Sequence, residues 1–270
     1  MASPEQDLVS VAPALDKDGV RLTVDDALAT VMLTNPAKRN AQSPALWRAL
    51  AEAGRSLPGT VRVVVLRGEG KSFSSGLDHQ MFTPEGIPGE PTFTDLARLD
   101  DAGLDAGIAS FQEAFTWWRR NDLVTVAAVQ GHAIGAGFQL ALACDLRVVA
   151  DDVQFAMRET SLGIVPDLAG THPLVELVGY ARALEICVTG RFIGADEAVG
   201  SGLANLAVPV GELDAAVRDL TAAILAAPRD AVVETKALLH GASGRTYEEQ
   251  RAAERAAQAR RLRDLAGIGD

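Results

Sequence analysis

Apolar residues along this chain gather in short runs, and those at 20–36, 61–68, 123–129 and 146–151 are typical of β-strands. Within residues 20–36, two runs rich in β-branched residues flank a pair of aspartates, and Asn35-Pro36 stops the second run, so this segment is predicted to be a β-hairpin. The run VRVVVLRG at 61–68 is nearly continuous, as in parallel strands that are covered on both faces.

Helical patterns alternate with these strands. Ser43 and Pro44 suit the cap and the first position of a helix over residues 43–56. FQEAFTWWRR at 111–120 predicts a helix with an aromatic face, and GAGFQLALACD at 135–145 predicts a short apolar helix after a glycine turn. The alternation predicts an α/β fold with crossover connections. From about residue 175 the pattern is mainly helical to the end of the chain.

Two further segments differ from this alternation. Residues 79–105 are rich in Pro, Gly and Asp, and we expect a mobile surface segment there. Residues 246–266 are rich in Ala, Glu and Arg, which predicts a long helix. This helix either has a solvated face or lies between subunits, where its arginines can reach an anionic ligand.

Composition limits the classes of function. A hydrophobic share of 48% and a charged share of 23% are typical of a soluble globular protein, and the net charge of -11 argues against nucleic acid as a partner. No uncharged apolar run is long enough to span a membrane, and the first ten residues lack a secretory signal pattern. Cys144 and Cys187 are therefore expected to be reduced core residues in a cytoplasmic protein. The histidines lie at no metal-ligand spacing, so no metal site is predicted.

Two glycine turns carry candidate chemistry. SFSSGLD at 72–78 follows the strand at 61–68, and GHAIGAGFQ at 131–139 follows the strand at 123–129. The first N–H groups of a helix are unpaired, so two such turns facing one another can hold an oxyanion between two donors. The alternative is two ordinary strand-to-helix turns. A dinucleotide fingerprint, a P-loop and a G-x-S-x-G elbow are all missing.

Two carboxylates interrupt the mostly apolar stretch RETSLGIVPDLAG at 158–170, namely Glu159 and Asp167. A carboxylate in an apolar pocket has a raised pKa, which suits a group that both accepts and donates protons. Structural interpretations stay open for both. Glu159 can be a loop acid paired with Arg158 or Arg147, and Asp167 can be a turn or N-cap residue.

Several motifs, in their order and spacing, resemble the crotonase, or enoyl-CoA hydratase/isomerase, superfamily. They are NPAKRNA (35–41), SFSSGLD (72–78), GHAIGAGFQLALACDLRVVADD (131–152), SLGIVPDLAG (161–170) and TGRFIGADEAVGSGLANLAVP (189–209). The resemblance implies an α/β crotonase-like spiral of ββα units with a C-terminal helical trimerisation region. It implies a core domain over residues 1–205 and a helical oligomerisation region over residues 206–270. It also implies an acyl-CoA thioester ligand, no separate cofactor, and a homotrimer or a hexamer.

The resemblance also assigns site residues. The backbone N–H groups of Leu77 and Ala136 would form an oxyanion hole for the thioester enolate. The family usually has Gly at the second position, and Ala136 keeps the N–H that is needed. Arg39 and the backbone around Ser75, Gly76 and Leu77 would lie near the CoA moiety.

The acids decide between branches of the superfamily. Related hydratases hold a water with two glutamates, and those positions are Gln139 and Glu159 here. An amide cannot exchange a proton at neutral pH, so Gln139 is expected to orient water or substrate. The chain most closely resembles the dienoyl-CoA isomerase branch, in which acids align with Glu159 and Asp167. One of them removes a proton and the other delivers one further along the acyl chain. Those isomerases carry a third acid at the Gln139 position.

Three functions therefore stay open. The favoured one is an enoyl- or dienoyl-CoA isomerase with Glu159 and Asp167 as proton carriers. The second is an enoyl-CoA hydratase in which Asp167 replaces the missing glutamate. The third is a non-catalytic acyl-CoA-binding homologue, which Gln139 motivates. A related dehalogenase shares the aspartate but not the glutamate and ranks lower. The large apolar residues that either belong to the core or line an acyl pocket are Met81, Phe82, Trp117, Trp118 and Phe138.

Overall fold

The computed structural model describes residues 14–268, so the first ten residues, where no secretory signal is predicted, lie outside it. Seven strands form one sheet in the order β1-β2-β3-β4-β5-β7-β9, and β6 pairs with β8 in a small second sheet. The strands are β1 (Leu15–Lys17), β2 (Val20–Asp25), β3 (Leu28–Leu33), β4 (Val63–Gly68), β5 (Val124–Val129), β6 (His132–Ile134), β7 (Leu146–Ala150), β8 (Gln154–Ala156) and β9 (Leu206–Val208).

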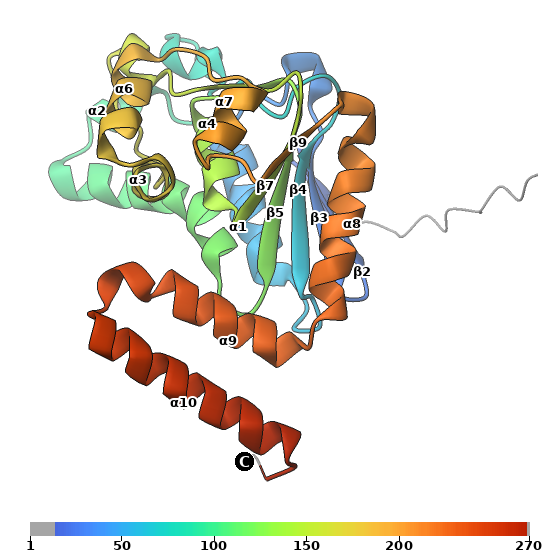
Figure 1. The fold of residues 1–270 in the computed structure, drawn as a ribbon. Coiled ribbons are helices and arrows are strands. Elements are labelled where there is room, and N and C mark those ends of the chain that lie inside the picture. Colours follow the sequence, from blue (N-terminus) through green and yellow to red (C-terminus); the bar gives the residue numbers. More distant parts are fainter. Residues whose placement is uncertain (1–13, 269–270) are drawn as a thin grey trace, which may run out of the picture.

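Helices cover both faces of the large sheet (Figure 1). The helices are α1 (Pro44–Ser56), α2 (Phe93–Ala97), α3 (Asp101–Thr116), α4 (Ala136–Ala143), α5 (Thr171–Val178), α6 (Tyr180–Thr189), α7 (Ala195–Gly200), α8 (Leu213–Ala226), α9 (Arg229–His240) and α10 (Tyr247–Leu265). Helix α8 packs on one face of the sheet, and α1, α3 and α4 belong to the main core on the other. The mixed α/β class is therefore confirmed.

The apolar pattern of the strands explains this layering. In β4, Val63 and Val65 face the α8 side, whereas Val64 and Leu66 face the main core. Because both faces are covered, the strand is apolar at nearly every position. The hairpin is also confirmed, since β2 and β3 pair antiparallel around Asp26 in a left-handed conformation (φ 50).

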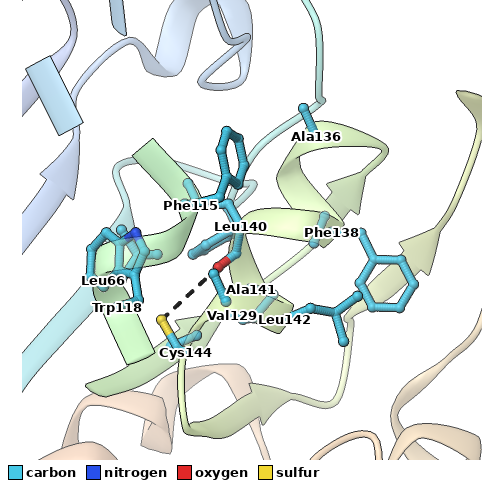
Figure 2. Packing of buried hydrophobic residues seen from close by; sticks show 14 of the residues in the cluster. Leu66, Phe115, Trp118, Val129, Ala136, Phe138, Leu140, Ala141, Leu142 and Cys144 are labelled. Atoms are coloured by element: carbon cyan, nitrogen blue, oxygen red, sulfur yellow. Dashed lines mark hydrogen bonds between the residues drawn. The ribbon is translucent and has the colours of Figure 1, made fainter. Parts of the chain in front are cut away.

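Helix α4 lies inside the main core. All of its residues are buried, and Figure 2 shows Phe138, Leu140 and Leu142 among side chains from neighbouring strands and helices. A helix that is apolar all round requires this position. Its N-terminus is therefore fixed by tight packing, which matters for the site described below.

The segment at 79–105 is more regular than predicted. It contains a 3₁₀ turn at His79–Phe82, all of α2, and the start of α3. The helix predicted from residue 111 begins at Asp101, because the Asp100 side chain accepts a hydrogen bond from Gly103 N–H and caps it. Thr92 and Asp95 form a capping box at α2. The prediction missed these helices because Pro, Gly and Asp were taken to indicate irregular structure.

Short bridges beside the large sheet build a second layer. Gln42 pairs with Leu77, and Ser74 pairs with Ala133. β6 then pairs in parallel with β8. At each step the chain leaves a strand of the large sheet, adds a segment to this layer and returns through a helix. This repeated step is the predicted spiral.

The C-terminal part divides into two portions. Strand β9 pairs in parallel with β7, and α8 packs on the sheet, so residues 206–226 adjoin the core. Helices α9 and α10 pack on each other and project away from the sheet (Figure 1). Helix α9 has no buried residue, and Ala257 is the buried residue of α10. The division at residues 205 and 206, and the role of this region in trimerisation, remain predictions.

Candidate active site

The two glycine turns lie side by side where β4 and β5 end. Ser74 N–H donates to His132 O at 2.9 Å, and Ile134 N–H donates to Ser74 O at 3.0 Å. Gly76 has φ +87, and a methyl group on it would lie 2.5 Å from Ile134 O. Glycine is therefore required here both for its backbone conformation and for the close approach of the second turn.

The second turn makes an equally close contact with the first. A methyl group on Gly137 would lie 2.7 Å from Ser74 O, so α4 starts directly against the first turn. On the other side, a methyl group on Gly76 would lie 3.6 Å from Ala136 N. The N-terminus of α4 and the Gly76-Leu77 peptide therefore border the same small space.

Two backbone N–H groups face this space. Gln42 N–H donates to Gly76 O at 2.7 Å, and Asp78 N–H donates to Gln42 O at 2.8 Å, so Leu77 between them directs its own N–H to the other side. Ala136 is the first residue of α4, where an N–H has no partner inside the helix. Within residues 14–268, neither N–H donates a hydrogen bond. Together they can stabilise an oxyanion.

Glu159 is held beside the same helix start. β6 pairs with β8, and Gly135 N–H donates to Ala156 O at 2.8 Å, which brings the chain after β8 to α4. A methyl group on Gly135 (φ +51) would lie 3.2 Å from Glu159 Oε1. The Glu159 side chain therefore adjoins the peptide that carries the Ala136 N–H.

The two carboxylate oxygens of Glu159 differ. The residue is only 3% exposed, and Oε1 accepts a hydrogen bond from Gln139 Nε2 at 2.6 Å. Oε2 is buried and has no hydrogen-bond partner among the described residues. Burial raises the pKa of Glu159, and the nearby charge of Asp167 raises it further, against the lowering effects of backbone hydrogen bonds and of the Gln139 hydrogen bond. One oxygen is thus held in place and the other is free to take a proton.

Asp167 lies half-buried on the loop that precedes α5. Burial raises the pKa of its carboxyl. The loop is tied to α3, because Gln112 Nε2 donates to Asp167 O at 2.7 Å. The N-cap interpretation is wrong, since α5 begins at Thr171 with Gly170 as its cap.

The ion-pair interpretation of Glu159 is also wrong. Arg158 turns away and donates to Gly190 O at 3.1 Å. Arg147 donates to Leu203 O at 2.6 Å and to Cys144 O at 2.7 Å. Both guanidinium groups donate to backbone carbonyls, so Glu159 has no counter-ion among residues 14–268.

Gln139 makes its hydrogen bonds within the protein. Its side chain is 1% exposed. While Nε2 donates to Glu159, Oε1 accepts from Leu168 N–H at 3.0 Å and Gly170 N–H at 3.4 Å. Both polar atoms of the Gln139 side chain are therefore used to bind other parts of the protein. This favours a role in holding the site together over the predicted role of orienting water or substrate.

The predicted CoA-contacting residues also lie together. Arg39 is exposed, and its carbonyl accepts from Ser75 N–H at 2.8 Å, directly before Gly76 and Leu77. Asn40, which no pattern in the sequence singled out, is fully buried. Its Nδ2 donates to the carbonyl oxygens of the loop before the first turn, namely those of Glu69, Ser72 and Phe73. The only signal for this role of Asn40 in the sequence is its position within the motif NPAKRNA.

The apolar candidates for the acyl pocket are mainly core. Trp118, Phe138 and Met81 are almost completely buried in the main core. Trp117 stacks on Trp118, with ring centroids 3.9 Å apart. Phe82 is 39% exposed and stacks on a neighbouring phenylalanine. Of the five residues, Phe82 is therefore the most exposed.

A cavity of about 640 Å³ lies elsewhere, between α9 and the edge of the sheet where β5 and β7 begin. It is lined by residues such as Val124, Leu146 and Lys236, and by none of the catalytic candidates. Within residues 14–268 there is no cluster of three or more potential metal ligands, and no helix there is both long and apolar enough to cross a bilayer.

Comparisons with known proteins agree with this geometry. A sequence model of the family described as enoyl-CoA hydratase/isomerase matches residues 23–264. The mitochondrial Delta(3,5)-Delta(2,4)-dienoyl-CoA isomerase of Homo sapiens is 35% identical over 211 residues, which cover 76% of this chain and 63% of that protein. The chain thus spans just under two thirds of the length of this relative.

Solved structures extend the likeness over nearly the whole chain. A protein of Thermobifida fusca YX described as an enoyl-CoA hydratase, in complex with CoA, is 50% identical with a TM-score of 0.87, over 92% of this chain and 95% of that one. A second structure described in the same way, in complex with acetoacetyl-CoA, is 51% identical with a TM-score of 0.87, over 91% and 95%. Both isomerase and hydratase descriptions therefore occur among the relatives.

Proposed function

The chain belongs to the enoyl-CoA hydratase/isomerase family, and on this premise we propose that it is an isomerase that shifts a carbon–carbon double bond of an enoyl- or dienoyl-CoA. Glu159 and Asp167 would carry the protons, and Leu77 and Ala136 would supply the oxyanion hole. CoA belongs to the substrate, so we propose that no separate cofactor takes part. The complexes of the Thermobifida proteins with CoA and acetoacetyl-CoA support this ligand class.

The first step is removal of a proton next to the thioester carbonyl. Glu159 Oε2 takes the proton, and the electron pair of the broken C–H bond moves into the thioester as an enolate. The proton is only weakly acidic, so the enolate must be stabilised as it forms. The N–H groups of Leu77 and Ala136 point to the space where that oxyanion would develop, and they need no reorganisation to bind it.

The second step returns a proton further along the acyl chain. The electrons of the enolate move back through the conjugated system, and the distant carbon takes a proton from Asp167. The product has its double bonds shifted, Glu159 is protonated and Asp167 is ionised. Proton exchange with solvent then restores the starting state.

The environments of the two acids suit these roles. Gln139 donates a hydrogen bond to Glu159, which favours the ionised form needed of a base. Burial raises the pKa of Asp167, and no side chain within the described residues donates to its carboxylate, so Asp167 holds a proton more readily than an exposed aspartate does. Two neighbouring carboxyls with different hydrogen bonds are the expected arrangement for an acid and a base in one pocket.

The observation that carries this proposal is the buried Oε2 of Glu159 beside the start of α4, which has no hydrogen-bond partner in the described part of the chain. A buried polar atom without a partner destabilises the fold, and such atoms are typical of functional sites. It argues against a purely non-catalytic acyl-CoA-binding role, because binding the thioester oxygen needs the N–H donors and not this carboxylate.

A hydratase is the second candidate. The hydratase descriptions of the Thermobifida proteins, at 50% and 51% identity, favour it. In this case Glu159 and Asp167 would hold a water, one acid deprotonating it while the other protonates the acyl chain. Gln139 cannot take the place of Glu159 or Asp167 in this reaction, because an amide does not exchange a proton at neutral pH.

A proton NMR time course in deuterated water separates the two. The protein is mixed with a 3-enoyl-CoA, a 3,5-dienoyl-CoA and a 2-enoyl-CoA in separate samples. Migration of the double bond with deuterium incorporation, and no added oxygen, is expected for the first two. A 3-hydroxyacyl product from the 2-enoyl ester as the main reaction would replace the isomerase by the hydratase. No conversion in any sample would refute both. Light scattering separately tests the expected oligomeric state, which is a trimer or a hexamer.

A further inference from the structure

Gln139 joins the two halves of the site. Through Nε2 it donates to Glu159 Oε1 at 2.6 Å. Through Oε1 it accepts from Leu168 N–H at 3.0 Å and from Gly170 N–H at 3.4 Å, on the loop that carries Asp167. One side chain on the rigid, fully buried α4 is therefore in contact with both acid-bearing segments.

We propose that Gln139 is a positioning residue, which holds Glu159 and the Asp167 loop at a fixed separation and leaves Glu159 Oε2 as the free proton-accepting oxygen. This inference rests on the proposed function. It replaces the direct role toward water or substrate that the sequence predicts for Gln139.

The loop needs such an anchor. Ala169 adopts a left-handed conformation with φ +62, which is unfavourable for a residue with a side chain. The flanking residues Leu168 and Gly170 both donate to the same Gln139 oxygen, so the strained peptide is held from both sides. The fit is close, since a methyl group on Gly170 would lie 2.7 Å from Gln139 Cγ. Strain that is held in this way is typical of functional loops.

An amide meets both demands without a change of protonation state. The loop N–H groups need an acceptor, and the ionised Glu159 needs a donor. A carboxylate at position 139 would accept from the loop but would place a second negative charge against Glu159. A hydrocarbon side chain would meet neither demand.

The surroundings of Glu159 leave Gln139 as its side-chain hydrogen-bond donor, beside the backbone N–H groups of Arg158 and of Glu159 itself. Two other titratable groups interact with Glu159, namely Asp167 on the loop and Cys187 on α6. The charge of Asp167 raises the pKa of Glu159, and burial and the charge of Glu159 raise the pKa of the Cys187 thiol. Arg158 is adjacent in sequence but donates to Gly190 O. Within the described residues, Gln139 is the side chain that gives Glu159 a hydrogen bond.

Two substitutions separate the two contacts. Gln139→Glu keeps the acceptor for the loop and, once both carboxyls are ionised, loses the donor to Glu159, whereas Gln139→Met loses both. Gln112→Met is the matched control, because Gln112 holds the same loop through Asp167 O and makes no contact with Glu159. All three are compared with the full-length wild type.

The first readout is the pKa of the Glu159 carboxyl. It is measured by carbon-13 NMR on glutamate-labelled protein and assigned with Glu159→Gln. We expect this pKa to rise in both Gln139 variants and to stay unchanged in Gln112→Met. The second readout is kcat/KM against pH with the preferred enoyl ester. The acid limb should move to higher pH in both Gln139 variants, and the maximum in Gln139→Met should fall by about 100-fold, as expected for a misplaced catalytic group.

The outcomes are distinguishable. A Glu159 pKa that does not change in either Gln139 variant overturns the positioning role, whether or not the protein is an isomerase. A wild type that converts no enoyl ester refutes the proposed function, and the NMR titration still tests the positioning role. If Gln139→Met lowers kcat/KM without moving the pKa, Gln139 acts on substrate, and the proposal is wrong.

Discussion

Replacement of Glu159 by glutamine should remove activity and at the same time stabilise the protein at neutral pH. The activity loss follows from the proposed role of Glu159 as the base, because an amide cannot accept the proton. The stability gain follows from the burial of the carboxylate, which is 3% exposed and has one oxygen without a partner. Gln139 still finds an acceptor in the new amide, so the existing hydrogen bond is kept.

The magnitude can be estimated from this one oxygen. A buried polar atom without a partner costs about 1–3 kcal/mol when it is neutral, and more when it is charged. Glutamine keeps a polar atom at this position and removes the charge, so we expect a gain on the order of 1–3 kcal/mol. For a chain of this size, 1 kcal/mol corresponds to about 2 °C in Tm, so the variant should melt about 2–6 °C higher at pH 8.

The sign of the pH dependence provides a second check. The folded-state pKa of Glu159 lies above the value of 4.5 expected for an unfolded glutamate. Its protonation therefore stabilises the fold fully below about pH 4.5, and this contribution is lost as the pH rises through the raised folded pKa. The difference in Tm between variant and wild type should thus be small in acid and largest at neutral and alkaline pH.

The assay is thermal unfolding between pH 4.5 and pH 8, combined with turnover of the enoyl ester that the wild type prefers. Glu176→Gln is the control, because Glu176 pairs with Arg119 outside the site and should give no stability gain. A Glu159→Gln protein that melts below the wild type at pH 8 would refute the account of the buried carboxylate. Near wild-type turnover would refute its role as the base.

Three further predictions concern the oxyanion hole, the acids and a supporting amide. Ala136→Pro removes one N–H donor at the first position of α4, where proline is compatible with a helix; kcat/KM should fall about 100- to 1000-fold, and Tyr247→Pro, at the first position of α10, should not reproduce this loss. The wild-type kcat/KM should be bell-shaped with pH, because the reaction needs one proton on the pair; activity is lost toward acid when both carboxyls are protonated and toward alkali when both are ionised, and burial moves both limbs upward from those of exposed carboxyls; a flat profile would contradict the pair. Asn40→Ala should lower the free energy of unfolding in urea by about 2–4 kcal/mol, because it leaves buried carbonyls unpaired.

Local signals in the sequence were sufficient for much of the fold. The hairpin, the cap at Ser43 and the apolar strands depend on neighbouring residues, and the structure confirms them. The helices around residues 93–110 were missed because their caps, Thr92 and Asp100, lie among residues that also favour loops. The separation of α9 and α10 from the core depends on tertiary contacts, which no local pattern contains.

The site shows the same limit. The glycine turns and Glu159 were singled out as candidates by their residue types, and the resemblance to the crotonase superfamily gave them their expected roles. The Gln139 side chain accepts hydrogen bonds from Leu168 and Gly170, which lie far along the chain. Its position between the two acids could therefore be recognised only from the structure. The alternative pairings of Glu159 with arginine were excluded in the same way, by backbone carbonyls that bind those guanidinium groups.

The chemistry of the site depends on strand register more than on any single loop. Ile134 is paired with Ala156, and this pairing places Gly135 against Glu159 and directs the Ala136 N–H to the space beside Leu77. A shift of one residue between β6 and β8 would turn the neighbouring side chains to the opposite face. The oxyanion donors and the base would then be separated, although every catalytic residue would still be present. The buried packing of α4 and the close glycine contacts resist such a shift, and in this fold the same interactions therefore stabilise the core and align the site.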